Sequence, residues 1–119
     1  MLPYIGADGT GQWLRIKYHY TGMEWVFFED VTITVDGTAY ERAFEYFDVT
    51  RDNDAEVWEW ADVPLTEEDA QMLRAIAASK ETVVRFEGGS HYFEYTVSQS
   101  DKDGITLVLD AFAVLNAEE

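Results

Sequence analysis

Residues 31–40 read VTITVDGTAY, and this stretch decides how the chain is expected to fold. Apolar β-branched residues alternate with threonines up to Val35, which is the period-two pattern of a strand with one buried face. The Asp36-Gly37 pair that follows tolerates the positive φ angles of a tight type I′ turn. The stretch therefore predicts a β-hairpin, with a first strand over residues 25–35 and a returning strand over residues 40–47.

Apolar and polar side chains also alternate before this hairpin, over residues 12–20. The side expected to face the core carries Leu14, Ile16, Tyr18 and Tyr20. The opposite side carries Trp13, Arg15, Lys17 and His19. Residues 1–11 are rich in glycine and show no periodic pattern, so we expect them to form a loose lead-in.

Signals for a loop, a strand and a helix follow the hairpin. Residues 48–55 are polar and are expected to form a loop, and residues 56–60 resume strand character before Pro64 ends the pairing. Thr66 offers a side-chain oxygen that can cap a helix, and the carboxylate of Asp69, three residues later, can complete a capping box. A helix is therefore predicted to begin at Thr66.

The last third of the chain repeats this order of elements. Residues 82–86 and 91–97 are predicted to form two strands, and a second capping pattern at Ser100 predicts a final helix. The predicted fold class is α+β, with an antiparallel sheet of about six strands, two helices packed on one face, and the order ββββαββα. We expect a single domain over residues 1–119 with a folded core over residues 12–115.

The composition limits the classes of function. Of the 119 residues, 24 are acidic and 8 are Lys or Arg, which gives a formal net charge of −16. This charge disfavours direct binding to nucleic acid or to an anionic membrane. The absence of cysteine excludes disulfide frameworks, thiolate zinc sites and cysteine nucleophiles. No membrane span or secretory signal is visible, so we expect a soluble chain, either cytoplasmic or trimmed from an exported or envelope protein.

Acidic residues are concentrated between Glu41 and Asp69, where eleven acids stand against two arginines. Such a run usually forms a solvated surface, although a surface of one sign also attracts a basic partner. Both interpretations stay open at this point. The candidate partner-binding residues of the segment are Glu41, Glu45, Asp52, Asp54 and Glu56.

Asp52, Asp54 and Glu56 also imitate, by their spacing, the first ligands of a calcium-binding loop. Such a loop requires glycine at its sixth position and a bidentate acid at its twelfth, whereas this chain has Val57 and Val63 there. The three acids are therefore weak candidates for a metal site, and no metal or other cofactor is predicted.

Four tryptophans form the second group of candidate residues: Trp13, Trp25, Trp58 and Trp60. Their flat faces can stack on sugars or bind a peptide. Trp58 and Trp60 stand two residues apart on one face of a strand, and we expect that face to belong to the core. Trp13 shares its face with basic side chains, so it is expected at the surface and joins the candidate partner-binding residues.

The sequence offers little catalytic chemistry. Its two histidines, His19 and His91, lie outside any nucleophile turn, and Gly88-Gly89 is too short for a phosphate-binding loop. We therefore expect that the protein is not an enzyme.

Several segments together resemble a group of small uncharacterised bacterial domains, which occur alone or in exported and lipoprotein chains. The resemblance is carried by residues 20–28, 35–37, 57–60, 68–69, 73–77, 85–88 and 108–112. It covers roughly residues 12–115 and implies no established activity, so no functional residue is carried over.

The sequence favours a non-enzymatic interaction module whose acidic and aromatic surface binds another protein of basic or neutral character. One alternative is an acidic inhibitor that mimics nucleic acid and occupies the basic groove of a DNA-binding enzyme. Another is a carbohydrate-active or carbohydrate-binding domain. A homodimer formed through an exposed aromatic sheet edge is also compatible with the pattern.

Overall fold

The computed structural model describes residues 1–9 and 11–117 and contains two antiparallel four-stranded sheets and two α-helices. Sheet A consists, in spatial order, of β1 (Leu2–Asp8), β2 (Gly11–Gly22), β6 (Val57–Pro64) and β5 (Val49–Asn53). Sheet B consists of β4 (Thr38–Ala43), β3 (Asp30–Val35), β7 (Thr82–Glu87) and β8 (Tyr92–Thr96). The helices are α1 (Glu67–Ala78) and α2 (Gln99–Ala117), and a short 3₁₀ turn, η1 (Tyr46–Asp48), precedes β5.

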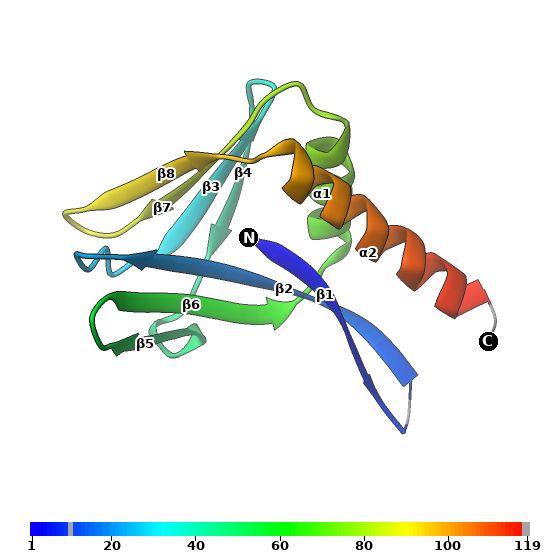
Figure 1. Cartoon of the computed structure of the whole chain (residues 1–119), viewed down its shortest axis with the longest axis horizontal. Helices are drawn as coiled ribbons and strands as arrows, with labels where there is room; N and C mark the ends of the chain where they lie inside the picture. Colours follow the sequence, from blue (N-terminus) through cyan, green and yellow to red (C-terminus); the bar gives the residue numbers. More distant parts are fainter. Residues whose placement is uncertain (10, 118–119) are drawn as a thin grey trace.

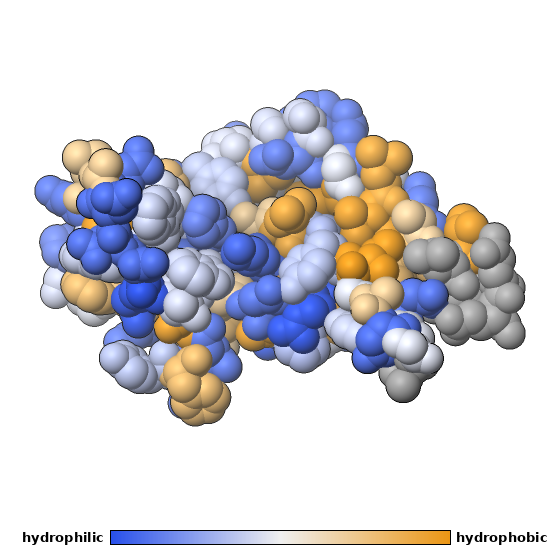
Figure 2. Space-filling model, turned by 60° about the horizontal axis from the view of Figure 1, so that its bottom comes forward, coloured by the Kyte–Doolittle hydropathy of each residue, from blue (hydrophilic) through white to orange (hydrophobic). Residues whose placement is uncertain are grey.

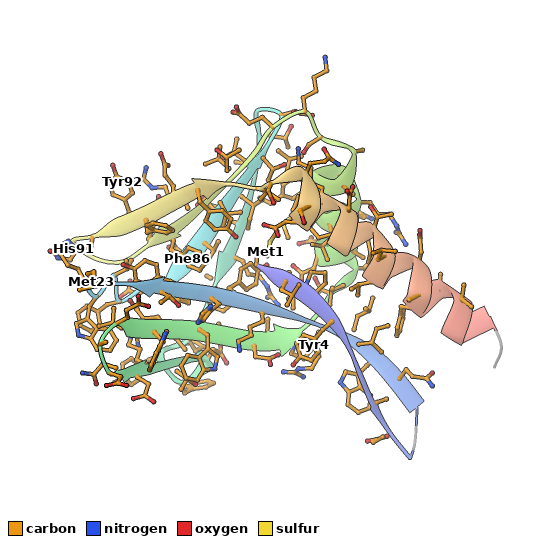
Figure 3. All side chains as sticks on the ribbon, in the orientation of Figure 1. Met1, Tyr4, Met23, Phe86, His91 and Tyr92 are labelled. Carbon is orange, nitrogen blue, oxygen red and sulfur yellow. The ribbon has the colours of Figure 1, made fainter. Side chains whose placement is uncertain are left out.

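The two sheets lie one above the other, and the helices lie next to each other at one end of the molecule (Figure 1). A single apolar core joins both layers and both helices. Its fully buried members include Ile16 and Tyr18 from sheet A, Ile33 and Phe86 from sheet B, Leu73 and Ile76 from α1, with Ile105 of α2 close to fully buried. Figure 3 shows Phe86 in the space between the sheets. Among the described residues, no helix is long and apolar enough to cross a bilayer.

The α+β class and the antiparallel pairing are confirmed, whereas the single sheet of about six strands is wrong. The described chain has eight strands in two sheets, six of them before α1. Part of the expected lead-in is β1, which pairs along β2 and turns Pro3 and Ile5 to the same side as Ile16. Part of the expected polar loop is β5, an edge strand that pairs with β6. Both strands form because they pair with a neighbouring strand. Their own residues show no local strand pattern, so the sequence did not predict them.

The predicted hairpin is confirmed as β3 and β4, and Asp36 and Gly37 have the positive φ angles of 46° and 90° that the tight turn requires. The first strand is shorter than predicted, because residues 25–29 form an irregular crossing from sheet A to sheet B. The returning strand runs from Thr38 to Ala43 and not to residue 47.

Both helix starts involve side-chain caps. The capping box at Thr66 is confirmed: its hydroxyl accepts from the Asp69 N–H at 3.1 Å, and the Asp69 carboxylate accepts from the Thr66 N–H at 2.9 Å. The last helix begins earlier than predicted, at Gln99, because Ser98 and not Ser100 supplies the cap. The Ser98 hydroxyl accepts from the Asp101 N–H at 3.1 Å. The helices also do not simply cover one sheet face, since α2 packs against β1 and β2 at the end of the core.

The crossing segment, defined as residues 25–29, is held by a buried carboxylate. Glu59 is completely inaccessible to solvent and accepts hydrogen bonds from the N–H groups of Val26 at 2.7 Å and Phe28 at 3.0 Å. Arg51 Nε donates to Glu59 Oε1 at 3.1 Å, and Arg51 Nη2 donates to the Phe28 carbonyl at 3.1 Å. Phe27, between the two anchored residues, takes a positive φ of 53°. Glu59 and Arg51 therefore replace the strand partners that this irregular segment lacks.

Asp36 links the β3–β4 turn to the end of α1 and gives a pH-dependent prediction. Its carboxylate accepts from the N–H groups of Glu81 at 2.9 Å and Lys80 at 3.0 Å, and these bonds lower the pKa of Asp36. A group with a lowered folded pKa stabilises the fold above its unfolded pKa of about 4 and loses this effect as the pH falls through the folded value. We expect Asp36→Asn to unfold at a lower temperature than the wild type at pH 7, because asparagine keeps the turn but not the charge.

The melting temperatures of the Asp36→Asn variant and the wild type should converge as the pH falls below about 4. Asp54→Asn, at an exposed acid of the β5–β6 turn, is the matched control. An Asp36→Asn difference that stays constant from pH 7 down to acid unfolding would show that the charge of Asp36 contributes nothing.

Candidate functional site

The side of sheet A that faces away from sheet B carries most of the tryptophans. On β2 and β6 the side chains alternate, so that Ile16, Tyr18 and Ala61 point into the core and their neighbours point outward. We call the outward set the sheet A face. It consists of Tyr4, Trp13, Arg15, Lys17, His19, Trp58, Trp60 and Asp62. Figure 3 shows Tyr4 below the strands of sheet A, on the opposite side from Phe86.

Trp13 lies at one end of the sheet A face and is 37% exposed, as predicted for this tryptophan. It pairs with Gly6 across the β1–β2 hairpin. A Cβ atom at Gly6 would lie 2.4 Å from Trp13 Nε1, so the indole ring covers the glycine. The small residue of β1 therefore fixes the orientation of the ring and leaves its other side to solvent.

Three polar residues form a bonded cluster next to Trp13. Arg15 donates from Nε to Asp62 Oδ1 at 2.9 Å and from Nη2 to the Asp62 carbonyl at 3.0 Å. The Tyr4 hydroxyl donates to the other carboxylate oxygen of Asp62, and this hydrogen bond raises the pKa of Tyr4. The cluster joins β1, β2 and β6, so the Tyr4 and Arg15 side chains are held in place on the sheet A face.

Lys17, His19 and Trp60 occupy the middle of the sheet A face. Lys17 Nζ lies 5.6 Å from the centre of the Trp60 ring, within the range of a cation–π contact, and His19 is opposite Trp60 in the strand pairing. Partial burial lowers the pKa of His19, and the neighbouring Lys17 lowers it further. The lowered pKa favours the neutral form of His19 at pH 7, and Asp62 balances Arg15, so Lys17 leaves the sheet A face with a formal charge of about +1.

Trp58 and Trp60 are not core residues, contrary to the sequence-based expectation. Val57, Glu59 and Ala61 take the inward positions of β6, and both tryptophans are half-buried on the sheet A face. The pattern of β6 allowed either assignment, because each of its faces holds both large and polar residues. The inward position of Glu59 is required by the crossing segment, and this requirement is not visible in the local pattern.

The structure does not bring the acidic candidates together with Trp13. Asp54 and Glu56 lie in the exposed β5–β6 turn, and Asp52 lies beside it on β5. Val57, at this turn, pairs with Gly22, and Trp13 lies nine residues earlier on the same strand (22 − 13 = 9). At about 3.3 Å per residue, these acids are about 30 Å from Trp13 along sheet A.

Glu41 and Glu45 lie elsewhere again. Glu41 is exposed on β4, an edge strand of sheet B, and Glu45 is exposed just before η1, where its N–H donates to Asp48 at 3.0 Å. Within residues 1–9 and 11–117, no three His, Asp or Glu side chains are arranged to hold a metal ion, and this includes Asp52, Asp54 and Glu56. The acids are thus spread over separate parts of the surface.

Trp25 lies in the crossing segment and not on a strand of sheet A, and its ring stacks on Phe27 at a centroid distance of 5.5 Å. Tyr46 and Phe47 of η1 are strongly exposed, at 88% and 81%. The guanidinium of Arg51 lies 5.6 Å from the Phe27 ring centre and 6.0 Å from that of Tyr46. The guanidinium of Arg51 therefore occupies the space between the Phe27 and Tyr46 rings.

Tyr4 belongs to the sheet A face but was not predicted as a site residue, because it lies in the expected lead-in. Figure 2 turns this side of the molecule forward and shows mostly hydrophilic and intermediate colours, with apolar surface gathered toward the end where α2 lies. The sheet A face is thus an open surface of tryptophans with bonded polar groups between them. Such a surface can bind a ligand by stacking and hydrogen bonding.

Comparison with known proteins found no similar protein: no family model, no curated protein and no solved structure matches this chain. The resemblance to small bacterial domains therefore stays a prediction, and the geometry of the sheet A face carries the functional argument.

Proposed function

We propose that the protein is a non-enzymatic interaction module that binds another protein through the sheet A face. The observation that carries this proposal is the gathering of three tryptophans on one open sheet face. Trp, Tyr and Arg are the residues that most often dominate binding energy at protein interfaces. Here Tyr4 and Arg15 are fixed by Asp62, so little of their conformational freedom remains to be lost on binding.

The charge distribution supports a partner with a neutral or basic surface. The chain carries a net charge of −16, while the sheet A face itself is nearly balanced. A field of one sign accelerates the encounter with a basic protein and repels acidic ones. The exposed acids around the face, including Asp52, Asp54 and Glu56, would act at this stage, and the tryptophans would make the close contact.

A carbohydrate ligand is the second candidate, favoured by the spacing of Trp58 and Trp60. These residues are two apart on one strand, so their Cα atoms are about 7 Å apart along it. The rings therefore offer successive stacking surfaces, with Lys17 and His19 as hydrogen-bonding groups beside them. Binding of the isolated protein to a glycan array, lost in Trp60→Ala, would favour this ligand over a protein.

The proposal predicts that Trp13→Ala combined with Trp60→Ala abolishes partner capture. Immobilised wild-type protein and the double variant would be compared for the proteins they retain from a lysate of the source organism, with elution by stepped salt. Loss of one interface tryptophan weakens binding by about 30-fold when it contributes about 2 kcal/mol. Tyr46→Ala with Phe47→Ala, which removes two more exposed rings away from sheet A, should leave capture unchanged.

Three controls separate the alternatives. Circular dichroism must show that both double variants are folded. Charge reversal at Glu41, Glu45 and Glu56 should slow capture and increase its salt sensitivity without removing it. Competition by duplex DNA for the captured protein would instead indicate an inhibitor that mimics nucleic acid. Equal retention of the same proteins by the wild type and the Trp13/Trp60 variant would overturn the role of the sheet A face.

A further inference from the structure

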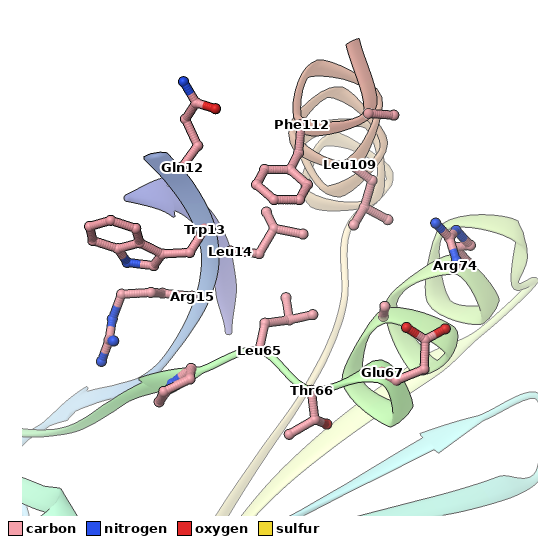
Figure 4. Close-up of a pocket in the computed structure, with 13 residues that line it drawn as sticks. Gln12, Trp13, Leu14, Arg15, Leu65, Thr66, Glu67, Arg74, Leu109 and Phe112 are labelled. Carbon is pink, nitrogen blue, oxygen red and sulfur yellow. The ribbon is translucent and has the colours of Figure 1, made fainter. Parts of the chain in front are cut away.

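The end of β2 that carries Trp13 also borders a groove beside the two helices. A groove of about 700 Å³ is formed by β2, the connection from β6 to α1, and the two helices (Figure 4). We call it the helix groove. Its volume lies within the range of about 300–1,000 Å³ that is typical of small-molecule sites. Figure 4 shows Leu14 directed into the groove, while Trp13 and Arg15, which also line it, are directed to the side of β2 that carries the sheet A face.

Apolar side chains from four elements line the helix groove. They are Leu14, Leu65, Ala70, Leu109 and Phe112. Figure 4 shows Leu14, Leu65 and Phe112 directed toward one another across the opening. All except Ala70 are half-buried, so the groove presents apolar surface that the described residues leave partly open to water. An apolar chain laid in the groove would remove this surface from water.

The charged side chains that line the helix groove indicate which head group a ligand would carry. Arg74, on α1, lines the groove and has no hydrogen-bond or ion-pair partner among residues 1–9 and 11–117. The other four arginines each contact a carboxylate: Arg15 with Asp62 at 2.9 Å, Arg42 with Asp69 at 3.4 Å, Arg51 with Glu59 at 3.1 Å and Arg85 with Glu87 at 2.6 Å. In a chain with 24 acids, the one arginine that has no carboxylate partner among the described residues therefore lines the apolar groove.

The position of Glu67 orients the ligand. Glu67 also lines the groove, seven residues before Arg74 on the same helix and therefore about 10 Å away along its axis. A negative head group is attracted to the Arg74 end of the groove and repelled from the Glu67 end. The apolar chain then lies over Leu65, Leu109 and Phe112.

We propose that the helix groove binds a single-chain fatty carboxylate, with the carboxylate on Arg74 and the acyl chain on the apolar floor. Guanidinium and carboxylate groups form paired, charge-assisted hydrogen bonds, which gives the head group its specificity. This proposal does not rest on the proposed binding of a protein at the sheet A face, although the two surfaces share Trp13 and Arg15.

Calorimetric titration of the whole protein with dodecanoate, below its micelle-forming concentration, tests the proposal. We expect saturable binding of one molecule per chain. Each two-carbon lengthening from octanoate to dodecanoate should tighten binding several-fold, since a fully buried methylene contributes about fourfold. Dodecanol, which lacks the charge, should bind about tenfold more weakly than dodecanoate.

Three variants locate the ligand. Arg74→Gln should weaken dodecanoate binding about tenfold and leave dodecanol unaffected. Glu67→Gln should tighten dodecanoate binding. Ala113→Trp, at an exposed position of α2 that lines the groove, should block both ligands without disturbing the core.

Lys80→Gln is the matched control for Arg74→Gln, because it removes an exposed positive charge away from the groove and should change nothing. Trp58→Ala with Trp60→Ala, at two residues of the sheet A face that do not line the groove, should also retain dodecanoate binding, so failure of the sheet A proposal would not affect this one. The proposal is overturned if dodecanoate does not bind, or if Arg74→Gln and Ala113→Trp leave its affinity unchanged.

Discussion

Replacing Glu59 with alanine will lower the free energy of unfolding by about 3–5 kcal/mol, the range observed when one partner of a buried ion pair is removed. The variant leaves the Arg51 guanidinium without its carboxylate and the N–H groups of Val26 and Phe28 without an acceptor. Unpaired buried donors lose their hydration without gaining a bond. A domain of this size has about 5–15 kcal/mol of stability in total, so the loss is a large fraction of it.

Urea unfolding followed by tryptophan fluorescence and circular dichroism measures this effect. Glu56→Ala, three residues earlier in the same chain segment, removes an exposed carboxylate and should change stability by less than about 0.5 kcal/mol. The stability of Glu59→Gln should fall between those of Glu59→Ala and Glu56→Ala, because its amide oxygen can keep the two hydrogen bonds that Glu59 Oε1 accepts, from Phe28 and Arg51, while its NH2 group faces the Val26 N–H. A Glu59→Ala variant within about 1 kcal/mol of the wild type would show that water replaces the carboxylate.

Glu59 also explains why the single predicted sheet was wrong. The sequence contains the hairpin at Asp36-Gly37 and the cap at Thr66 as local signals, and both were found as predicted. The division into two sheets occurs at the crossing segment, where the chain leaves one layer and enters the other. Its N–H groups are satisfied by a side chain 31 to 33 residues away in sequence, so no local pattern reveals the break.

The sequence predicted the parts of the candidate site whose signals lie on a single strand. It did not predict the parts that depend on pairing between distant strands. Trp13 was expected at the surface because its strand face carries Arg15, Lys17 and His19, and it is exposed. Tyr4 and Trp60 join the same face through strand pairings across the sheet, which depend on β1 and on the inward position of Glu59. The acidic residues are neighbours in sequence but lie on different strands and turns, so their concentration along the chain does not become a single patch.

Gly88→Ala is expected to lower the free energy of unfolding by about 3 kcal/mol, at the upper end of the range for overpacked sites. A Cβ atom at Gly88 would lie 2.0 Å from the Val26 carbonyl oxygen and 2.9 Å from that of Phe27. These are backbone atoms of the crossing segment, which Glu59 holds in place, so the clash cannot be relieved by turning a side chain.

Gly89→Ala is the matched control for Gly88→Ala, because no atom lies within 4 Å of a Cβ built at Gly89 and its φ is not positive. This substitution should be neutral or stabilise the fold by about 0.5 kcal/mol through the unfolded chain. Similar losses in the two variants would contradict the close approach at Gly88. Because Gly88 and Glu59 act on the same segment, the combination of Gly88→Ala with Glu59→Ala should lose less stability than the sum of the two, since a segment already released from Glu59 can move away from the added methyl group.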